Sequence, residues 1–321
     1  MKNLKRLFVL GVAVSALVAP ALGQSDGTIT LLVGYSAGGS ADFAARVVAP
    51  ELGERLGRTV VVENATGASG MIALQNLLNG GTDGSILYYG GFDTVAVPMV
   101  NKSVGIDWKV ETIPVGRTAI TSMSITVPAA SPYTSLGDLV AAAKAEPDTL
   151  TYGTPGIGSA QHFVGEMIST VGDITLVHAP YQGGAQVATD LLAGLLDSAV
   201  LTTSTALPFI KDGQVRALAV TSSDRSSALP DVPALGEIPG FEGVALPLFQ
   251  GVFVKAGTSP EIVAELSAAI ADLAADPDVV ARLAESGFVA APLEAQPFAA
   301  FIDEQQAIYA SIIDGAQISV E

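Results

Sequence analysis

Short apolar runs alternate with segments of helical periodicity along most of the chain, and this alternation constrains the fold more than any other feature. Residues 28–34 and 85–89 have the length and composition of buried strands, whereas residues 41–56 space their apolar side chains as a helix does. Strands that are buried on both faces need helices on both sides of their sheet. The sequence therefore predicts an α/β fold of mostly parallel sheets flanked by helices.

The predicted elements follow one another in a regular order. The expected strands are 28–34, 59–63, 85–89, 112–115, 124–127, 149–152, 175–179, 198–203, 215–221 and 251–255. The expected helices are 41–56, 70–78, 136–145, 160–170, 185–193, one that starts at 260 and one at 297–313. Two helix starts have explicit capping signals. Ser135 with Asp138 forms a capping box, and Ser259 with Pro260 places a cap before a proline at the first helical position.

The first 23 residues have the pattern of a secretory signal peptide. Lys2, Lys5 and Arg6 precede an apolar run of about 12 residues, which is shorter than the roughly 20 that span a bilayer. Small residues near Gly23 predict cleavage after that position. The rest of the chain is long enough for two domains, which we place at 24–122 with 246–321 and at 123–245.

The composition excludes several classes of protein and site. Without cysteine the chain has no disulfides, no thiolate metal ligands and no cysteine nucleophile. Hydrophobic residues make up 49% and charged residues 15%, which is typical of a well-buried globular protein. After Gly23, 12 Lys and Arg stand against 32 Asp and Glu, and this excess of negative charge repels nucleic acid. An anionic ligand would need local donors such as helix N-termini.

Three strand-to-helix turns are rich in glycine and small hydroxyl residues. They are residues 35–42, 153–159 and 181–184, and each ends where a helix is predicted to begin. Glycine lets backbone N–H groups approach a ligand closely, and a helix N-terminus adds partial positive charge. Ligands of open α/β sheets bind beyond the carboxyl ends of the strands. The turns therefore predict an anion-binding site, although a tight turn alone can also require such glycines.

Other chemistries match less well. Residues 34–38 fit the pattern G-x-S-x-G, in which Ser36 would be a hydrolase nucleophile with His162 or His178 as its base. This motif lies too near the start of the chain to follow the strands that a hydrolase sheet needs. His178, inside an apolar strand, is expected in the core, and His162 is expected to line a cleft. The glycines of 153–158 have the wrong spacing for a dinucleotide turn, and two histidines with scattered aspartates predict no metal and no cofactor.

Several segments stand in a characteristic order along the chain. They are Ala-Gly-Gly-Ser-Ala-Asp at 37–42, Val-Val-Glu-Asn at 61–64, Gly-Ala-Ser-Gly at 67–70, Leu-Thr-Tyr-Gly-Thr at 150–154, His-Ala-Pro-Tyr-Gln-Gly at 178–183, Asp-Leu-Leu-Ala-Gly at 190–194, Arg-Ala-Leu-Ala-Val-Thr at 216–221 and Leu-Pro-Asp-Val-Pro at 229–233. Together they resemble the tripartite tricarboxylate transporter receptors, the Bug or TctC family of periplasmic binding proteins. One departure is Gly34, which stands where the family often has proline.

The resemblance implies a type II periplasmic binding protein, a Venus flytrap that holds a small carboxylate between two domains. The ligand would be a di- or tricarboxylate, an aromatic acid or an amino acid. The protein would be a periplasmic monomer and not an enzyme. It would present its closed state to membrane permease subunits, or alternatively to a signalling kinase. The site residues implied by position are Tyr35, Ser36, Ala37, Gly38, Gly39, Asp42, Thr154, Gly158, Ser159, His162, Tyr181, Gln182 and Gly183, with Asp93 and Thr94 as further candidates.

Overall fold

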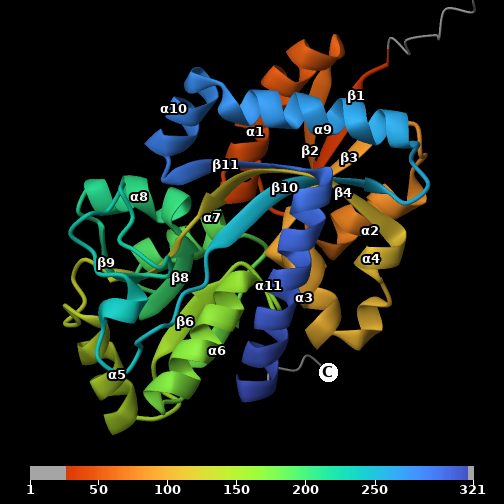
Figure 1. The fold of residues 1–321 in the computed structure, drawn as a ribbon. Coiled ribbons are helices and arrows are strands. Elements are labelled where there is room, and N and C mark those ends of the chain that lie inside the picture. The colour runs from red at the N-terminus through yellow and green to blue at the C-terminus, as the bar shows by residue number, and fades with distance from the viewer. Residues whose placement is uncertain (1–26, 317–321) are drawn as a thin grey trace, which may run out of the picture.

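The computed structural model describes residues 27–316, which form two α/β lobes (Figure 1). The predicted signal peptide and its cleavage after Gly23 lie outside this range. The first lobe contains a six-stranded sheet of order β11-β4-β10-β3-β1-β2, formed by β1 (Ile29–Val33), β2 (Val60–Asn64), β3 (Ile86–Gly91), β4 (Thr112–Thr121), β10 (Leu248–Lys255) and β11 (Phe288–Glu294). The second lobe contains a five-stranded sheet of order β7-β6-β8-β5-β9, formed by β5 (Met123–Pro128), β6 (Thr151–Thr154), β7 (Val177–Pro180), β8 (Ser198–Thr202) and β9 (Val215–Val220).

Helices cover both sheets. The first lobe has α1 (Ser40–Leu56), η1 (Ala68–Gly70), α2 (Met71–Asn79), α3 (Phe92–Val100), η2 (Lys102–Val104), α4 (Trp108–Glu111), α9 (Pro260–Ala275), α10 (Pro277–Glu285) and α11 (Ala295–Ala316). The second lobe has α5 (Leu136–Ala145), α6 (Ala160–Gly172), α7 (Gly184–Leu192), α8 (Thr203–Lys211) and η3 (Leu235–Glu237). Within residues 27–316, no helix combines the length and the apolar character needed to cross a membrane.

The predicted α/β class is confirmed, and both sheets are mixed. β1 pairs in parallel with β2 and β3, and β6 pairs in parallel with β7 and β8. β10 runs antiparallel to β3 and β4, and β5 runs antiparallel to β8 and β9. The chain leaves the first lobe along β4 and returns along β10. These neighbouring strands therefore run in opposite directions, which the prediction of mostly parallel sheets does not include.

The two lobes are joined where these strands cross between them. Ser122 links β4 to β5, and Leu246 precedes β10. Thr221 connects both crossings, because its hydroxyl donates to Leu246 O (3.0 Å) and accepts from Met123 N (3.0 Å). Adjacent crossing strands of this kind are where two lobes can pivot. The domain ranges given above stay a prediction, since the strand assignments alone do not define where each domain ends.

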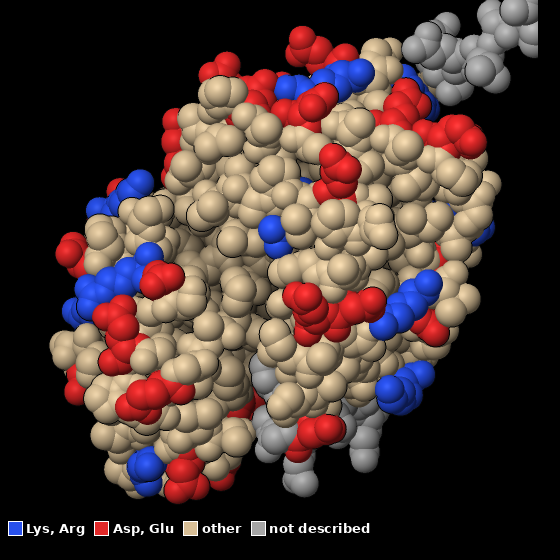
Figure 2. Space-filling model, viewed as in Figure 1, with Lys and Arg blue, Asp and Glu red and all other residues tan. Residues whose placement is uncertain are grey.

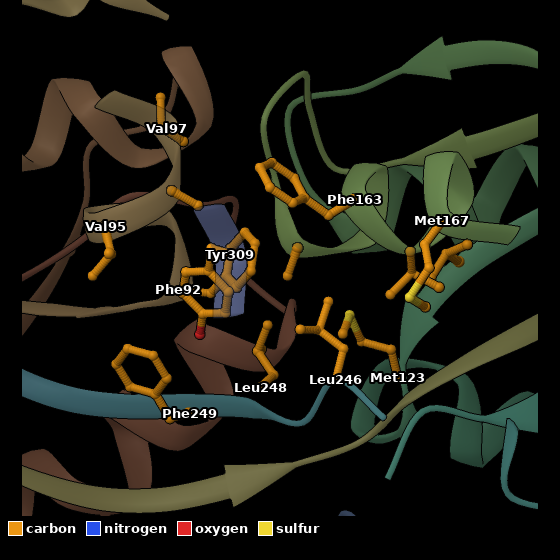
Figure 3. Close-up of a cluster of buried hydrophobic side chains, with 14 of the residues drawn as sticks. Phe92, Val95, Val97, Met123, Phe163, Met167, Leu246, Leu248, Phe249 and Tyr309 are labelled. Carbon is orange, nitrogen blue, oxygen red and sulfur yellow. The ribbon is translucent and has the colours of Figure 1, made fainter. Parts of the chain in front are cut away.

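One hydrophobic cluster contains buried residues of both lobes. In Figure 3, Phe92 of α3, Phe163 of α6 and Tyr309 of α11 face one another. The ring centroids of Phe92 and Phe163 are 4.9 Å apart, edge to face, and those of Phe92 and Tyr309 are 4.3 Å apart. Burying one such ring contributes about 1.5–3 kcal/mol. Because α11 also packs against β4, the last helix covers the joint between the lobes.

Local capping signals give the helix starts that they predict. Ser135 Oγ accepts from Asp138 N (3.1 Å), and Asp138 Oδ2 accepts from Ser135 N (2.9 Å), so the capping box of α5 is confirmed. Ser259 Oγ accepts from Ile262 N (3.4 Å) at the start of α9. These contacts span at most three residues, which is why the sequence predicts them.

Other elements depend on packing and are not predicted. Helices α3, α8 and α10 and strand β11 lie outside the expected elements, and β4 continues to Thr121 instead of ending at Val115. α3 contains Pro98, and α8 contains Pro208 after a start rich in hydroxyl residues. Both features lower intrinsic helix propensity. Burial of their apolar faces in the two lobes outweighs that preference.

Candidate functional site

Three adjoining pockets lie between the two lobes. The inner pocket is the smallest of the three and has a volume of about 30 Å³. The mouth pocket, about 350 Å³, shares Tyr35 and Pro155 with it, and the rear pocket, about 410 Å³, shares Gly39, Ser40 and Thr205 with it. The three pockets therefore form a row across the contact between the lobes, with the inner pocket in the middle.

Five helices begin at the inner pocket. Each contributes a residue of its first turn to the pocket wall, namely Ser40 of α1, Asp93 of α3, Gln161 of α6, Gly184 of α7 and Thr205 of α8. The first N–H groups of a helix have no acceptor within the helix, and they carry partial positive charge. Because five such ends surround one small space, the wall suits an anion even though no Lys or Arg lines any of the three pockets.

Two of these helix ends keep donors free. Within the described residues, the N–H groups of Ser40 and Ala41 in α1 and of Gly184 and Ala185 in α7 have no acceptor. α1 belongs to the first lobe and α7 to the second. A carboxylate in the inner pocket would accept charge-assisted hydrogen bonds from both lobes, and such bonds are stronger than neutral ones.

The loop before α1 is shaped by Asp42. Its carboxylate accepts from Gly38 N (3.0 Å), from Arg46 Nε (2.9 Å) and from Asn64 Nδ2 (3.0 Å). Burial disfavours the charged form of Asp42, but these hydrogen bonds outweigh burial and lower its pKa. Asn64 also donates to Tyr35 O (2.9 Å). Asp42 therefore holds residues 35–38 in place from behind and lines none of the three pockets.

The turn before α6 is held by hydrogen bonds of its own. Ser159 Oγ donates to Gly156 O (2.7 Å) and accepts from His162 N (3.3 Å), and Gly158 N donates to His162 Nδ1 (3.1 Å). Gly158 has a φ of +79°, in the left-handed region that favours glycine. Thr154 Oγ1 lies 2.6 Å from His178 Nε2. Thr154, Gly158, Ser159 and His162 give the turn its shape and do not line the pockets, whereas Gly156 lines the mouth pocket.

The two histidines form a stack beside this turn. The rings of His162 and His178 are 4.2 Å apart, and Tyr152 stacks on His178 at 4.8 Å. Burial lowers the pKa of both histidines, and the neighbouring His162 lowers the pKa of His178 further, to about 3. Both rings are therefore neutral at pH 7. Within the described chain neither ring makes a hydrogen bond to Ser36, so the arrangement needed for a serine nucleophile is not formed.

The lobes touch through glycines at the edge of the site. A Cβ on Gly183 would lie 2.1 Å from Ser36 Oγ, and a Cβ on Gly156 would lie 2.7 Å from Ser69 Oγ. Ser69 also donates a hydrogen bond to Ile157 O across the gap. Within the first lobe, a Cβ on Gly34 would lie 2.3 Å from the Cα of Gly70, which explains why this chain has no larger residue there.

Several polar atoms near the inner pocket are buried and unpartnered within the described chain. They are the Tyr35 hydroxyl, Ser36 Oγ, Asp93 Oδ1 and Thr94 Oγ1. Burial raises the pKa of Asp93 to about 7, although nearby donors, the Tyr35 hydroxyl and Ala160 N–H, favour its charged form. Buried polar groups are normally paired, so unpartnered ones in a pocket wall indicate that something else binds there.

The charged surface leaves the space between the lobes largely uncharged. On the face shown in Figure 2, acidic and basic side chains lie on the outer parts of both lobes, and the recess between the lobes is mostly uncharged. Among residues 27–316, no three His, Asp or Glu side chains are grouped so that they could hold a metal ion. Attraction of an anion between the lobes therefore depends on backbone N–H groups and on uncharged polar side chains of the pocket wall.

The sequence matches a known family model over residues 44–318, that of the "Tripartite tricarboxylate transporter family receptor". The chain belongs to this receptor family. A relative from Bordetella bronchiseptica, a UPF0065 protein, is 30% identical over 99% of this chain and 95% of its own length. The Bordetella pertussis protein BugT is 30% identical over 92% of each chain.

Solved structures support the same assignment. The periplasmic binding protein BugD has 28% identity and a TM-score of 0.86, covering 92% of this chain and 99% of its own. The R. palustris protein Rpa4515, solved with adipate, has 27% identity and a TM-score of 0.87, covering 91% of this chain and 98% of its own. The predicted two-domain binding-protein fold is therefore confirmed, and this receptor is not an enzyme.

The structure brings together some of the predicted site residues and not others. Those that line a pocket are Tyr35, Gly38, Gly39, Asp93, Tyr181 and Gln182. Ser36 and Gly183 meet where the lobes touch. The residues that support the turns are Asp42, Thr154, Gly158, Ser159 and His162. Thr94 is fully buried and Ala37 is exposed. His178, expected in the core, is half-buried in β7.

Five residues that line the receptor's inner pocket with polar side chains are absent from the predicted site residues. They are Ser40, Gln161, Thr202, Thr205 and Gln250. Ser40 lies within the turn at 35–42 that the sequence singles out, and Gln161 lies two positions after the turn at 153–159. The hydroxyl run at 202–205 follows a buried strand and is a signal that could have identified the turn before α8. Nothing in the sequence around Gln250, which lies within strand β10, indicates a site.

Proposed function

We propose that this receptor is exported to the periplasm, captures a small carboxylate in the inner pocket, and presents its closed form to the membrane permease subunits of a transporter. One observation carries the proposal: five helix N-termini from both lobes meet at a pocket without basic side chains. A carboxylate there would be held by N–H donors of α1 and α7 together, so its binding would favour the closed arrangement of the lobes.

The size of the inner pocket implies an opening movement. A volume of about 30 Å³ holds a few atoms at most, which is less than a dicarboxylate needs. A dicarboxylate would therefore enter only when the lobes separate, with the pivot at Ser122 and Leu246. The mouth and rear pockets would then receive the part of the ligand that lies beyond its carboxylate. The structure of Rpa4515 with adipate supports a ligand of this class, because that protein shares the fold at 27% identity.

A substitution that removes one N–H group tests the proposal. Ser40 is the first residue of α1, where proline is tolerated, and the preceding Gly39 has φ −79° and ψ 173°, which a following proline allows. Ser40→Pro therefore deletes the N–H donor with little effect on the helix. Ser40→Ala is the matched control, since it removes the hydroxyl and keeps the N–H.

Binding of adipate, succinate, malate, citrate, benzoate and L-glutamate to residues 24–321 would be screened by thermal shift and measured by calorimetry. A hydrogen bond to a charged group contributes about 1.5–3 kcal/mol, so Ser40→Pro should weaken binding of the preferred acid by roughly 10- to 150-fold. Ser40→Ala should bind nearly as tightly as the wild type. Equal affinity of Ser40→Pro and the wild type would contradict the proposed site, as would a lack of binding to every acid.

A further inference from the structure

Asp93 places a carboxyl group in the wall of a pocket that otherwise suits an anion. It is the second residue of α3, and it is the only Asp or Glu among the residues that line the inner, mouth and rear pockets. Its Oδ1 is buried and has no hydrogen-bond partner among the described residues. Among residues 27–316, no Lys or Arg lines these pockets, so this part of the protein does not supply a counter-charge there.

The surroundings of Asp93 make a missing counter-charge costly. Phe92, which precedes Asp93 in the chain, and Tyr309 belong to the buried cluster that joins the lobes (Figure 3). Burial raises its pKa to about 7, while the Tyr35 hydroxyl and Ala160 N–H favour the charged form. A buried carboxylate is stable only when it is paired with a cation or with several donors. Because Asp93 lines the inner pocket and its Oδ1 has no partner among the described residues, a cationic group of the ligand would supply the missing partner.

We propose that Asp93 determines ligand specificity by selecting an acid that also carries an ammonium group, namely an α-amino acid. Its carboxylate would bind the N-termini of α1 and α7, and its ammonium group would donate to Asp93. This inference rests on the proposed function. Since Ser40, Gly184 and Asp93 all border one pocket of about 30 Å³, the two charged groups of the ligand must be attached to the same carbon atom, as they are in an α-amino acid.

The overall charge of the chain favours the same ligand class. The full sequence has a formal charge of −17, which repels a dicarboxylate at long range but acts little on a zwitterion. A purely structural role for Asp93 makes a different prediction. If its carboxylate only tied α3 to the N-terminus of α6 at Ala160, it would stabilise the closed form equally for every ligand.

Matched pairs of acids that differ only in the ammonium group separate these roles. The pairs are L-alanine and propionate, L-leucine and 4-methylpentanoate, L-aspartate and succinate, and L-glutamate and glutarate. Their affinities for residues 24–321 would be measured by calorimetry for the wild type, for Asp93→Asn and for Asp93→Ser. Asp303→Asn is the control, because it makes the same change of charge at an exposed residue of α11 that pairs with Lys109.

In at least one pair the wild type should bind the amino acid about 10- to 100-fold more tightly than its partner, and both Asp93 variants should lose most of this preference. Asp303→Asn should keep it. Tighter binding of the acids without an ammonium group, with a ratio unchanged in Asp93→Asn, would overturn the inference and leave the proposed function intact. Equal weakening of both members of a pair would assign Asp93 the structural role and would also overturn it. Failure of all eight acids to bind would overturn the inference, and it would contradict the proposed function as well if adipate, malate, citrate and benzoate also failed to bind.

Discussion

Alanine at Gly183 should keep the two lobes from closing fully. A Cβ there would lie 2.1 Å from Ser36 Oγ and 3.2 Å from both Cβ and N of Ser36, across the contact between the lobes. Gly183 has a φ of 165°, which is extended backbone that alanine adopts without strain. The cost of Gly183→Ala therefore comes from this contact alone.

The size of the effect follows from the overlap. Non-bonded heavy atoms prefer separations of about 3.5 Å, so the contact must widen by roughly an ångström even after the Ser36 hydroxyl rotates away. Overpacking of this kind costs about 1–3 kcal/mol. Because only the closed form contains the contact, the affinity for the preferred acid should fall by about 5- to 150-fold, while the free energy of unfolding of the ligand-free protein changes little.

Calorimetric titration with that acid measures the effect, and two further variants control it. Gly137→Ala makes the same change at an exposed position inside α5, far from the pockets, and should leave affinity unchanged. Adding Ser36→Gly to Gly183→Ala removes the opposing Cβ and hydroxyl and should restore most of the binding. An affinity of Gly183→Ala within twofold of the wild type would refute the idea that ligand-bound lobes meet at this point.

Three other substitutions test the forces described above. Burial raises the pKa of Asp93 from 3.8 to about 7, so ionisation of Asp93 destabilises the folded protein increasingly as the pH rises between those values. Asp93→Asn should therefore be more stable than the wild type at pH 8, by up to about 4 kcal/mol, and no more stable than the wild type at pH 4. Urea unfolding without ligand measures both differences. Asp42→Asn weakens the hydrogen bonds that fix Gly38 and Arg46, and it should lower the ligand affinity measured by calorimetry about tenfold. An unchanged affinity would show that the loop before α1 does not need this support. Ser135→Ala removes the cap of α5 and should reduce the free energy of unfolding by about 1 kcal/mol while leaving affinity unchanged; a change in affinity would show that α5 is coupled to the site.

The accuracy of the sequence predictions depended on how far apart the contacting residues are. The capping box at Ser135 and the cap at Ser259 involve residues no more than three positions apart, and both are confirmed. Helix α8 begins with residues of low helix propensity and contains Pro208, so its formation depends on packing against β8 and β9. The turn at 202–205 was missed for the same reason, and with it one side of the inner pocket.

The pocket wall shows the same limit at the level of single residues. The sequence indicates that residues 35–42 face a ligand, but it does not tell which of them do. Asp42 forms hydrogen bonds inside its own loop, whereas Ser40 faces the pocket, and this difference depends on the position of Asn64 and Arg46. Gln250 joins the same wall from a strand more than 200 positions away, which no spacing in the sequence indicates.

The sequence alone determined the α/β class, the glycine-rich turns before α1, α6 and α7, and the resemblance to a receptor family, because these depend on local periodicity, backbone freedom and the order of motifs. Only the tertiary structure decided that five helix starts meet at one pocket and that Asp93 lies among them without a counter-charge. Convergence of this kind depends on how two sheets and their crossing strands are placed in space. Contacts between residues far apart in the chain set that placement, and they leave no periodic signal in the sequence.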